Sequence, residues 1–399
     1  MEEEKLKGLF IGDMVAETGF ATVMHNIIKN IRDDFEITGV GVNYNGDPHD
    51  YDFPIFPAMI GGRGNIYGLD RVVNLLSSRE FDFVFILNDP WVISYYLDVI
   101  KKNVKGKLPK IIVYFPVDSR YHDKDWYRDY DIVHTAVTYT EFGKTVVNHP
   151  DCAPKLDLKV VPHGVESSDF YKMYETPEEA RQVLFQKQYG SPELPKDMFI
   201  VLNANRNQPR KKLDITVAGF AEFAKNKPNN VKLYMHSGVR DASVDLIKES
   251  KRYKIDNRII FTSLNQGIQR VSKEKLNLIY NVCDVGINTS LGEGWGLTNM
   301  EHAVTGAVQV VPRHSSCEEL FSDCGLLMET VIDWTFDNSE TVGRVTTPQE
   351  VARCLELLYQ DRELKNKLAE KGRQKFIQPQ YEWKTIAQTW KEIYLEACK

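Results

Sequence analysis

The feature that most limits the possible folds is an alternation of short β-branched runs with longer amphipathic stretches, which occurs twice along the 399 residues. In the first half, strand-like runs such as FDFVFIL and KIIVYF alternate with helix-like stretches such as GFATVMHNIIKNI. The alternation pauses in a polar, proline-containing segment at 165–197 and restarts with MFIVLNA. This pattern is typical of mostly parallel sheets with helices on both faces. We therefore predict an α/β protein of two Rossmann-like, doubly wound parallel-sheet domains that face each other across a cleft.

The pause divides the chain into two predicted domains. We assign residues 1–170 to the first domain and residues 171–380 to the second. The C-terminal segments carry apolar residues at three- and four-residue steps, the pattern of helices with one buried face. We expect the aromatic side chains of the last segment, 381–399, to belong to the core.

The stretch TSLGEGWGLTNMEH places Glu293 and Glu301 on either side of Gly294, Trp295 and Gly296. It follows an apolar run and opens a helix, so we expect it at the carboxyl end of a strand, where open α/β sheets bind ligands. Glycines allow the backbone to approach a ligand closely, and the first N–H groups of a helix favour an anion. The stretch therefore predicts a phosphate cradle, although it matches neither the Walker A motif nor G-x-G-x-x-G.

The two carboxylates point to sugars beside this phosphate. A carboxylate near phosphate would be repelled, so we expect Glu301 to reach past it and accept hydrogen bonds from sugar hydroxyls. The same reasoning assigns Glu293 to the hydroxyls of a second sugar. A diphosphate with a sugar on each side is a nucleotide sugar. The alternative is a plain strand-to-helix turn, in which the helix dipole alone accounts for the acids.

A basic segment, NRNQPRKKLD, follows the first strand of the same half and contains Arg206, Arg210, Lys211 and Lys212. A diphosphate leaving group gains negative charge as its bond to the sugar breaks. Cations at the strand end can stabilise that charge in the transition state, so no metal ion is required. The alternative is a solvated basic loop.

These motifs resemble those of the retaining nucleotide-sugar glycosyltransferases of the two-domain B-type fold, glycosyltransferase family 4. SLGEGWGLTNMEHAVTGAVQVV keeps the family's E-x7-E spacing, and NRNQPRKKLD is similar to its basic motif. VPHGVESSDF is similar to its interdomain crossing, and TGFATVMHNI to its N-terminal glycine loop. The final helix resembles the one that crosses back onto the first domain. The basic motif also resembles that of a chlorella-virus-type subgroup that uses GDP-mannose.

The resemblance implies roles for matching residues. Arg206 and Lys211 would bind the donor diphosphate, Glu301 the nucleotide ribose, and Glu293 the hydroxyls of the donor sugar. Gly19 would approach the phosphates from the other domain. The implied donor site comprises Gly19, Arg206, Lys211, Glu293, Gly294, Trp295, Gly296, Leu297, Thr298 and Glu301.

Further candidates come from partial matches to the family's pattern. Many relatives have a histidine near the end of the fourth N-terminal strand, where this chain reads YFPVDSRYHD. Asp118, grouped with the catalytic residues, and His122 are therefore candidates for orienting the acceptor. His163, at the interdomain crossing, is either a cleft residue or a packed core histidine. Base contacts are expected around TSLNQGIQR, with Gln266 and Ile268 as candidates.

The implied reaction is metal-independent transfer of a hexose, with retention, from a GDP-mannose- or UDP-glucose-type donor (EC 2.4.1 type). The acceptor would be a glycan, lipid-linked or protein hydroxyl. No cofactor other than the nucleotide-sugar donor is expected. The alternatives are a sugar-nucleotide epimerase of the same shape, a pyridoxal-dependent phosphorylase, a metal-dependent A-type transferase using an Asp-x-Asp pair, and a non-catalytic sugar-nucleotide-binding module.

Composition argues against other partners. The net charge of −6 disfavours nucleic acid, which usually requires a basic surface. Six scattered cysteines without a C-x-x-C pair fit a reducing cytoplasm and predict no metal site. No apolar run approaches the roughly 18 residues of a membrane span, and the acidic start is unlike a signal peptide. We predict a cytoplasmic protein whose lysine-dense segment 101–110 allows peripheral membrane contact; homodimer formation stays open.

Overall fold

The computed structural model describes all residues except 1–4, 17, 190–196, 265–266, 268–270 and 338. The chain forms two compact units, each described here by itself. The first unit comprises Met1–Gly164 together with Pro379–Lys399, and the second comprises Val165–Gln378.

The first unit contains a seven-stranded parallel sheet in the order β3-β2-β1-β4-β5-β6-β7. Its strands are β1 (Lys7–Asp13), β2 (Glu36–Val42), β3 (Ile55–Pro57), β4 (Phe83–Leu87), β5 (Lys110–Phe115), β6 (Val133–Thr138) and β7 (Leu158–Val160). The inner strands are continuous apolar runs because helices cover both faces, leaving almost no side chain in water. The short strand β3 is not anticipated by the sequence pattern.

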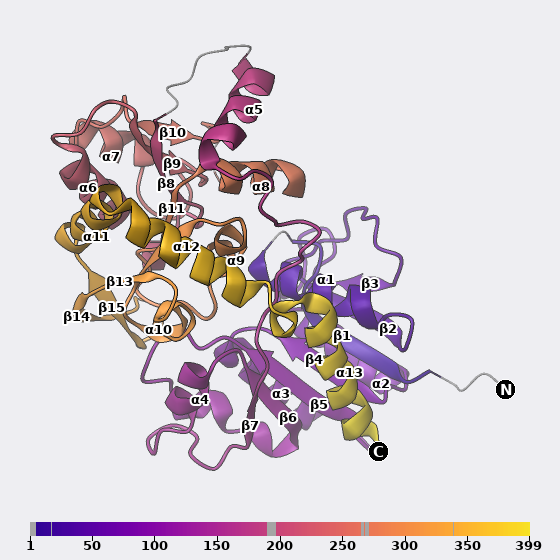
Figure 1. The fold of residues 1–399 in the computed structure, drawn as a ribbon. Coiled ribbons are helices and arrows are strands. Elements are labelled where there is room, and N and C mark those ends of the chain that lie inside the picture. The colour runs from indigo at the N-terminus through magenta and orange to yellow at the C-terminus, as the bar shows by residue number, and fades with distance from the viewer. Residues whose placement is uncertain (1–4, 17, 190–196, 265–266, 268–270, 338) are drawn as a thin grey trace. The chain divides into compact units, whose positions relative to one another are not determined.

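Among the described residues of this unit, five segments form α-helices. They are α1 (Gly19–Ile31), α2 (Leu69–Ser78), α3 (Pro90–Asn103), α4 (Glu141–Val147) and α13 (Trp383–Cys398). The C-terminal α13 packs against α1 and β4 (Figure 1). Its Tyr394 ring stacks on Phe83 with centroids 4.6 Å apart, and Trp390 meets Phe85 edge-on at 4.9 Å. Aromatic contacts between buried rings therefore attach the end of the chain to the first sheet.

The second unit repeats the architecture with a six-stranded parallel sheet in the order β10-β9-β8-β11-β12-β13. Its strands are β8 (Phe199–Asn203), β9 (Val231–Met235), β10 (Ile259–Phe261), β11 (Val285–Ile287), β12 (Val308–Pro312) and β13 (Leu326–Met328). In both sheets the strand order reverses beside the first strand, as in doubly wound folds. The structure thus confirms the predicted α/β class with two Rossmann-like parallel sheets.

Helices cover this second sheet (Figure 1). They are α5 (Pro177–Tyr189), α6 (Leu213–Ala224), α7 (Leu246–Arg252), α8 (Lys273–Val282), α9 (Leu297–Val304), α10 (Ser315–Phe321), α11 (Pro348–Gln360) and α12 (Arg362–Phe376). The close packing of α6 on α11 requires Gly219, because an added Cβ would overlap Val351. Helix α5 lies in the segment that the sequence pattern presented as a polar pause. Its Arg181 is buried and binds Asp284 at the start of β11.

An antiparallel hairpin, β14 (Thr330–Thr335) and β15 (Val342–Thr346), is a further addition that the alternation did not predict. The hairpin fastens the loop after β11. The Arg344 N–H donates to the Leu291 carbonyl at 2.8 Å, and the Leu291 N–H donates to the Arg210 carbonyl at 2.8 Å. Two segments distant in sequence from this loop, those of Arg210 and Arg344, therefore hold it in place.

Candidate functional site

The candidate site lies where the strand order of the second sheet reverses. Strands β8 and β11 are neighbours there, with Val201 opposite Val285. The basic segment leaves the carboxyl end of β8 through a single 3-10 turn, η3 (Pro209–Lys211), and the Gly-Trp-Gly loop leaves the carboxyl end of β11. Open α/β sheets bind ligands in the crevice at this position. Sheet topology therefore brings together two motifs that lie about 80 residues apart.

Lys211 and Glu293 form a buried ion pair at this point, with 8% and 6% of their surfaces exposed. The Lys211 ammonium donates to Glu293 Oε2. Arg210 lies next to the pair: its Nη1 is 3.8 Å from Glu293 Oε1 and donates to the Gly292 carbonyl at 2.9 Å. Two of the four predicted cations, Lys211 and Arg210, thus lie against the first predicted carboxylate.

The charges of this pair depend on one another. Burial opposes ionisation of Glu293, but the charges of Lys211 and Arg210 outweigh it and lower its pKa to about 2. Burial also lowers the pKa of Lys211, although the Glu293 carboxylate acts in the opposite direction. At neutral pH Glu293 is a carboxylate. Any anionic ligand entering the site therefore competes with this carboxylate for Lys211.

Two serines clamp the backbone of Glu293. The Glu293 N–H donates to Ser315 Oγ at 3.1 Å, and Ser316 Oγ donates to the Glu293 carbonyl at 2.7 Å. Ser315 has φ +55°, a left-handed conformation that non-glycine residues seldom adopt and that is concentrated at functional sites. Neither serine was predicted from the sequence, because both follow β12 and no local pattern links them to the glycine-rich loop.

Gly296 is the N-cap of α9 and has φ +91°. An added Cβ would lie 3.3 Å from Glu293 Cγ, so glycine is required both for the backbone conformation and for the space beside the carboxylate. Leu297 and Thr298 form the half-buried first turn of α9, whose N–H groups have no acceptor within the helix. This geometry suits an anion.

The other two loop residues are buried. Gly294 is packed in the loop, and Trp295 is only 4% exposed. The indole Nε1–H of Trp295 donates to Met300 Sδ at 3.3 Å. Trp295 thereby fastens the loop to the helix that follows it.

Arg206 stands apart from the buried pair, with 43% of its side chain exposed. It forms a two-pronged ion pair with Asp241, at 2.7 and 3.4 Å. Asp241 was missed by the sequence reasoning. It follows β9, however, so the rule that ligands collect at carboxyl ends of strands would have included it.

Glu301 lies one turn into α9, half-buried, and accepts a hydrogen bond from Tyr280 Oη at 3.0 Å. Burial raises the pKa of Glu301 to about 7, while Tyr280 and the charge of Lys273 oppose the rise and Asp169 adds to it. The two glutamates that bracket the loop therefore differ in protonation near neutral pH. Glu293 is firmly ionised, whereas Glu301 is divided between its acid and carboxylate forms near neutral pH.

The remaining described candidates lie in the first unit. Gly19 opens α1 behind the N-cap Thr18, whose Oγ1 donates to Asp13 at 2.7 Å. Asp118 follows β5, is half-buried and accepts a hydrogen bond from Ser119 Oγ at 3.0 Å.

The two candidate histidines of this unit are packed among aromatic rings. His122 is buried, its Nδ1 lies 2.8 Å from Tyr127 Oη, and burial lowers its pKa to about 4. His163 is buried with its ring centroid 4.0 Å from that of Tyr139, and burial lowers its pKa to about 3. Both side chains are therefore uncharged at neutral pH. Gln266 and Ile268 lie outside the described residues.

Two other sequence features are paired within the protein. Lys101, in the lysine-dense segment, binds both acids of one Asp-x-Asp pair: Asp129 at 3.1 Å and Asp131 at 2.8 Å. Lys102 binds Asp98 one turn earlier on α3. Part of the charge that suggested lipid contact is thus neutralised locally. Within the described part of the chain, no three His, Cys, Asp or Glu side chains gather as a metal ion would need.

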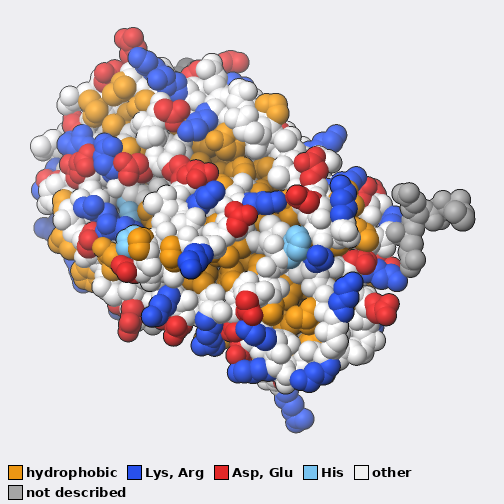
Figure 2. All heavy atoms as spheres, turned by 90° about the horizontal axis from the view of Figure 1, so that it is seen from below, with side chains coloured by type: hydrophobic (Ala, Val, Ile, Leu, Met, Phe, Trp, Pro, Cys, Tyr) orange, Lys and Arg blue, Asp and Glu red, His pale blue; other side chains and the backbone are white. Residues whose placement is uncertain are grey.

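The surface carries both signs of charge. Figure 2 shows acidic and basic side chains interspersed over the face that it presents. Among the described residues, no helix has the length and apolar character that a membrane crossing needs. A pocket of about 580 Å³ opens in the first unit between the loop after β3 and the start of α2, with Arg63, Asn65, Arg71 and Asn74 in its lining.

Comparisons with known proteins show what the chain resembles. No family model matches it. The α-monoglucosyldiacylglycerol synthase of Acholeplasma laidlawii is 25% identical over 170 residues, which are 42% of this chain and 39% of that enzyme. The chain therefore matches well under half the length of this curated relative.

Solved structures match nearly the whole chain. Sucrose-phosphate synthase from Thermosynechococcus elongatus has a TM-score of 0.74 at 14% identity, covering 98% of this chain and 99% of that one. Anabaena HepE, solved with UDP and glucose, has a TM-score of 0.72 at 15% identity, covering 98% and 100%. The lipopolysaccharide glycosyltransferase WaaG has a TM-score of 0.63 at 11% identity, covering 98% and 99%. The chain thus has the fold of the B-type glycosyltransferases.

Proposed function

We propose that this protein is a retaining hexosyltransferase that uses a nucleoside diphosphate sugar as donor. The observation that carries the proposal is the buried Lys211–Glu293 pair beside the glycine-capped start of α9, at the reversal point of the second sheet. A cation and helix N–H groups suit a diphosphate, and the neighbouring carboxylate suits sugar hydroxyls. HepE, which shares the fold, is solved with UDP-glucose and with UDP and glucose.

In this proposal donor binding changes the partners of two cations. Lys211 leaves Glu293 for the diphosphate, and Arg206 leaves Asp241 for the same ligand. Glu293, released from Lys211, accepts hydrogen bonds from hydroxyls of the donor sugar. Glu301 accepts the ribose hydroxyls in its carboxylate form. The site exchanges internal ion pairs for contacts with the ligand, so the charges are oriented before the donor arrives.

The reaction breaks the bond between the anomeric carbon and the diphosphate oxygen and forms a bond from that carbon to the acceptor oxygen on the same face. The proton of the acceptor hydroxyl passes to the departing diphosphate. Lys211 and Arg206 stabilise the negative charge that builds on this leaving group, and no metal ion takes part. The acceptor is a hydroxyl of a glycan, lipid or protein. Because the named relative is an α-monoglucosyldiacylglycerol synthase, a diacylglycerol-type acceptor is the first to test.

The test is to incubate the purified protein with UDP-glucose or GDP-mannose, with and without lipid and glycan acceptors, and to measure free nucleoside diphosphate and product linkage. We expect one donor to release its nucleoside diphosphate and to form an α-linked product. Glu293→Gln should lower turnover by about 10²-fold or more, the usual scale for losing one preorganised charged group at a reacting centre. The surface variant Lys225→Met is the matched control and should leave the rate unchanged.

The alternatives give different products. An epimerase would convert the donor sugar without net release of nucleoside diphosphate. A binding module would bind the nucleotide and turn nothing over. Either result, with the wild-type protein folded and the nucleotide bound, would refute the transferase proposal.

A further inference from the structure

A row of three buried side-chain amides runs behind the Glu293 carboxylate. Asn288 follows β11, Asn299 lies on α9, and Gln309 lies on β12, and all three are at most 4% exposed. Three separate elements thus supply neutral polar groups to one interior line. Amides are rarely buried without full hydrogen bonding, so their partners define what the row does.

The hydrogen bonds of this row run in one direction. Gln309 Nε2 donates to the Ala307 carbonyl at 3.0 Å, and Gln309 Oε1 accepts from Asn299 Nδ2 at 2.9 Å. Asn299 Oδ1 accepts from Asn288 Nδ2 at 3.0 Å. Asn288 Nδ2 also donates to Glu293 Oε2 at 3.2 Å. The side-chain NH₂ group of Asn288 therefore donates both of its hydrogens, one to Asn299 and one to the Glu293 carboxylate.

Backbone groups fix this direction at both ends. Asn288 Oδ1 accepts from the Ser290 N–H at 2.8 Å, and the far end of the row rests on the Ala307 carbonyl. A flipped Asn288 amide would place its oxygen against the oxygens of Glu293 and Asn299 and its NH₂ against the Ser290 N–H. The flipped arrangement breaks every one of these bonds, so Asn288 can only donate to Glu293.

A glycine on the neighbouring strand leaves the space that the Gln309 amide occupies. Gly286 on β11 faces Gln309, and a Cβ at Gly286 would overlap Gln309 Oε1. An apolar side chain in place of Gln309 would fill the same space without needing partners, so packing alone does not account for an amide there.

We propose that Asn288, oriented by Asn299 and Gln309, is a positioning residue for Glu293. The proposal rests on the transferase function above, in which Lys211 leaves Glu293 when the donor binds. Lys211 and Asn288 share the same oxygen, Oε2. Once Lys211 has turned to the diphosphate, Asn288 keeps that oxygen in place, so Oε1 stays directed at the donor sugar.

The test reverses the polarity of one group. Asn288→Asp replaces a fixed donor by a carboxyl that can donate to Glu293 only while it holds a proton. The charged groups that face this point are Lys211 and Arg210 on η3. The Cys317 thiol on α10 also lies nearby, but burial raises its pKa and keeps it uncharged. Two acids sharing one proton titrate as a coupled pair, and one of the two steps is raised.

We expect the variant to lose turnover by about 10²-fold at neutral pH, the scale of a misplaced reacting group, with a much smaller change in nucleotide affinity. Its kcat/KM should fall as pH rises through the raised step, a limb that the wild type lacks. Gln309→Met, which breaks the row at its far end without touching Glu293, should lower kcat more mildly. The matched control is Asn230→Asp at the amino end of β9, whose amide donates to the Asp197 carbonyl at 2.9 Å.

A second readout does not need the reaction. In protein labelled with ¹³C at side-chain carboxyls, Asn288→Asp should show one additional carboxyl that titrates between about pH 5 and 8, absent from the wild type and from Asn230→Asp. An Asn288→Asp protein that folds, keeps wild-type pH behaviour and shows no such titration would overturn the proposal. If the wild type transfers no sugar but the titration appears, the function is wrong and the contact between Asn288 and Glu293 stands.

Discussion

The sharpest consequence of the site is that Lys211 and Glu293 should depend on each other for stability. Each is buried and each is the other's main counter-charge. Lys211→Met leaves a carboxylate with Asn288 and Arg210, and Glu293→Gln leaves an ammonium without its acid. Removing one member of a buried pair usually costs about 3 to 5 kcal/mol, because the remaining charge is uncompensated. The double variant removes both charges and should be more stable than either single variant.

The magnitude follows from the carboxyl group. The lowering of the Glu293 pKa from its ordinary 4.5 to about 2 corresponds to about 3 kcal/mol, since one pKa unit is worth about 1.4 kcal/mol. Burial lowers the pKa of Lys211 as well, so the net contribution of the pair to folding is smaller than this coupling. We therefore expect a coupling energy of at least about 3 kcal/mol, because each single variant should lose about 3 to 5 kcal/mol whereas the double variant should stay within about 1 to 2 kcal/mol of the wild type.

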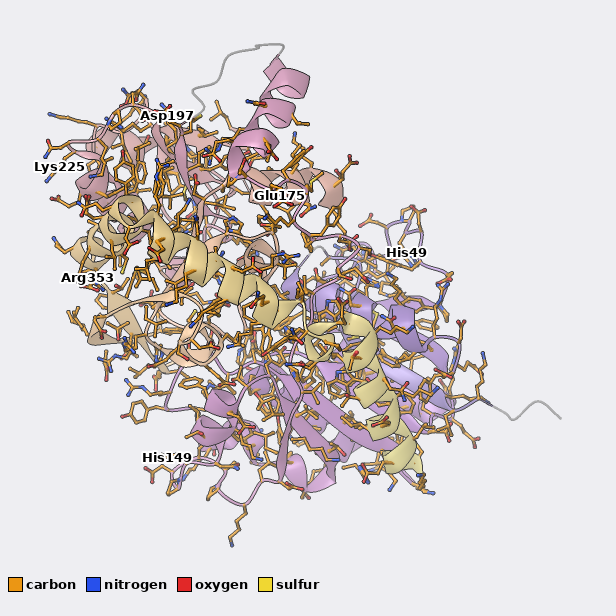
Figure 3. The ribbon with its side chains drawn as sticks, viewed as in Figure 1. His49, His149, Glu175, Asp197, Lys225 and Arg353 are labelled. Carbon is orange, nitrogen blue, oxygen red and sulfur yellow. The ribbon has the colours of Figure 1, made fainter. Side chains whose placement is uncertain are left out.

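The assay is urea unfolding of the wild type, both single variants and the double variant at pH 7. The control cycle uses an exposed ion pair between Glu222, on α6, and Lys225, the C-cap of that helix, which is labelled in Figure 3. Its coupling should stay below about 0.5 kcal/mol. Additive effects at Lys211 and Glu293, or a coupling no larger than the control, would refute the reasoning.

The Lys211–Glu293 pair should also make the stability of the fold depend on pH in acid solution. A depressed carboxyl pKa contributes stability that is present above its unfolded value near 4.5 and is lost as pH falls toward 2. Stability of the wild type should therefore fall through this window, and Glu293→Gln should remove that part of the fall. Acid titrations of the two proteins, followed by circular dichroism, measure the difference.

Three further outcomes are expected. Because the pKa of Glu301 is raised to about 7, nucleoside diphosphate binding should tighten as pH rises from about 6 to 8, and calorimetry should find no such trend for Glu301→Gln. Protonated Glu301 also contributes to folding stability: this contribution is complete below about pH 4.5 and is lost as pH rises through 7. Gly296→Ala should cost about 1 to 2 kcal/mol of stability and reduce turnover, because a side chain there is strained at φ +91° and presses on Glu293; thermal unfolding and initial rates check both. Chelation with EDTA should leave the initial rate unchanged, and a rate that falls and is restored by added Mg²⁺ or Mn²⁺ would contradict the metal-free reaction.

Much of the fold followed from local patterns. The predicted helix GFATVMHNIIKNI is α1 from end to end. Such a segment can be recognised from the sequence because the spacing of its apolar residues matches the helical period. Strand β3 and helix α5 were not recognisable in this way, because a three-residue strand has no measurable period and α5 is mostly polar and lacks a regular apolar stripe. The hairpin β14–β15 was missed because its outer strand is exposed on both faces and has no alternation.

The candidate site divides in the same way. Residue type and position after a strand were enough to select Glu293, Glu301 and the basic segment as ligand-binding candidates. The family resemblance then singled out Arg206 and Lys211 within that segment. The sequence did not indicate that Arg206 forms an ion pair with Asp241. The two residues lie 35 positions apart and meet only because β8 and β9, which precede them, are neighbouring strands.

What the sequence determined by itself is the main strand–helix alternation of the two α/β halves and the chemical types at the ends of their strands, because both depend on neighbours within a few residues. What the tertiary structure decided is which of those groups meet. Lys211 and Glu293 are 82 residues apart, and they pair only because β11 inserts beside β8. The tertiary structure also decided the ionisation states of the two glutamates. Lys211 and Arg210 lower the pKa of Glu293, whereas burial raises that of Glu301. Ionisation depends on the field of all nearby groups, and that field exists only in the folded chain.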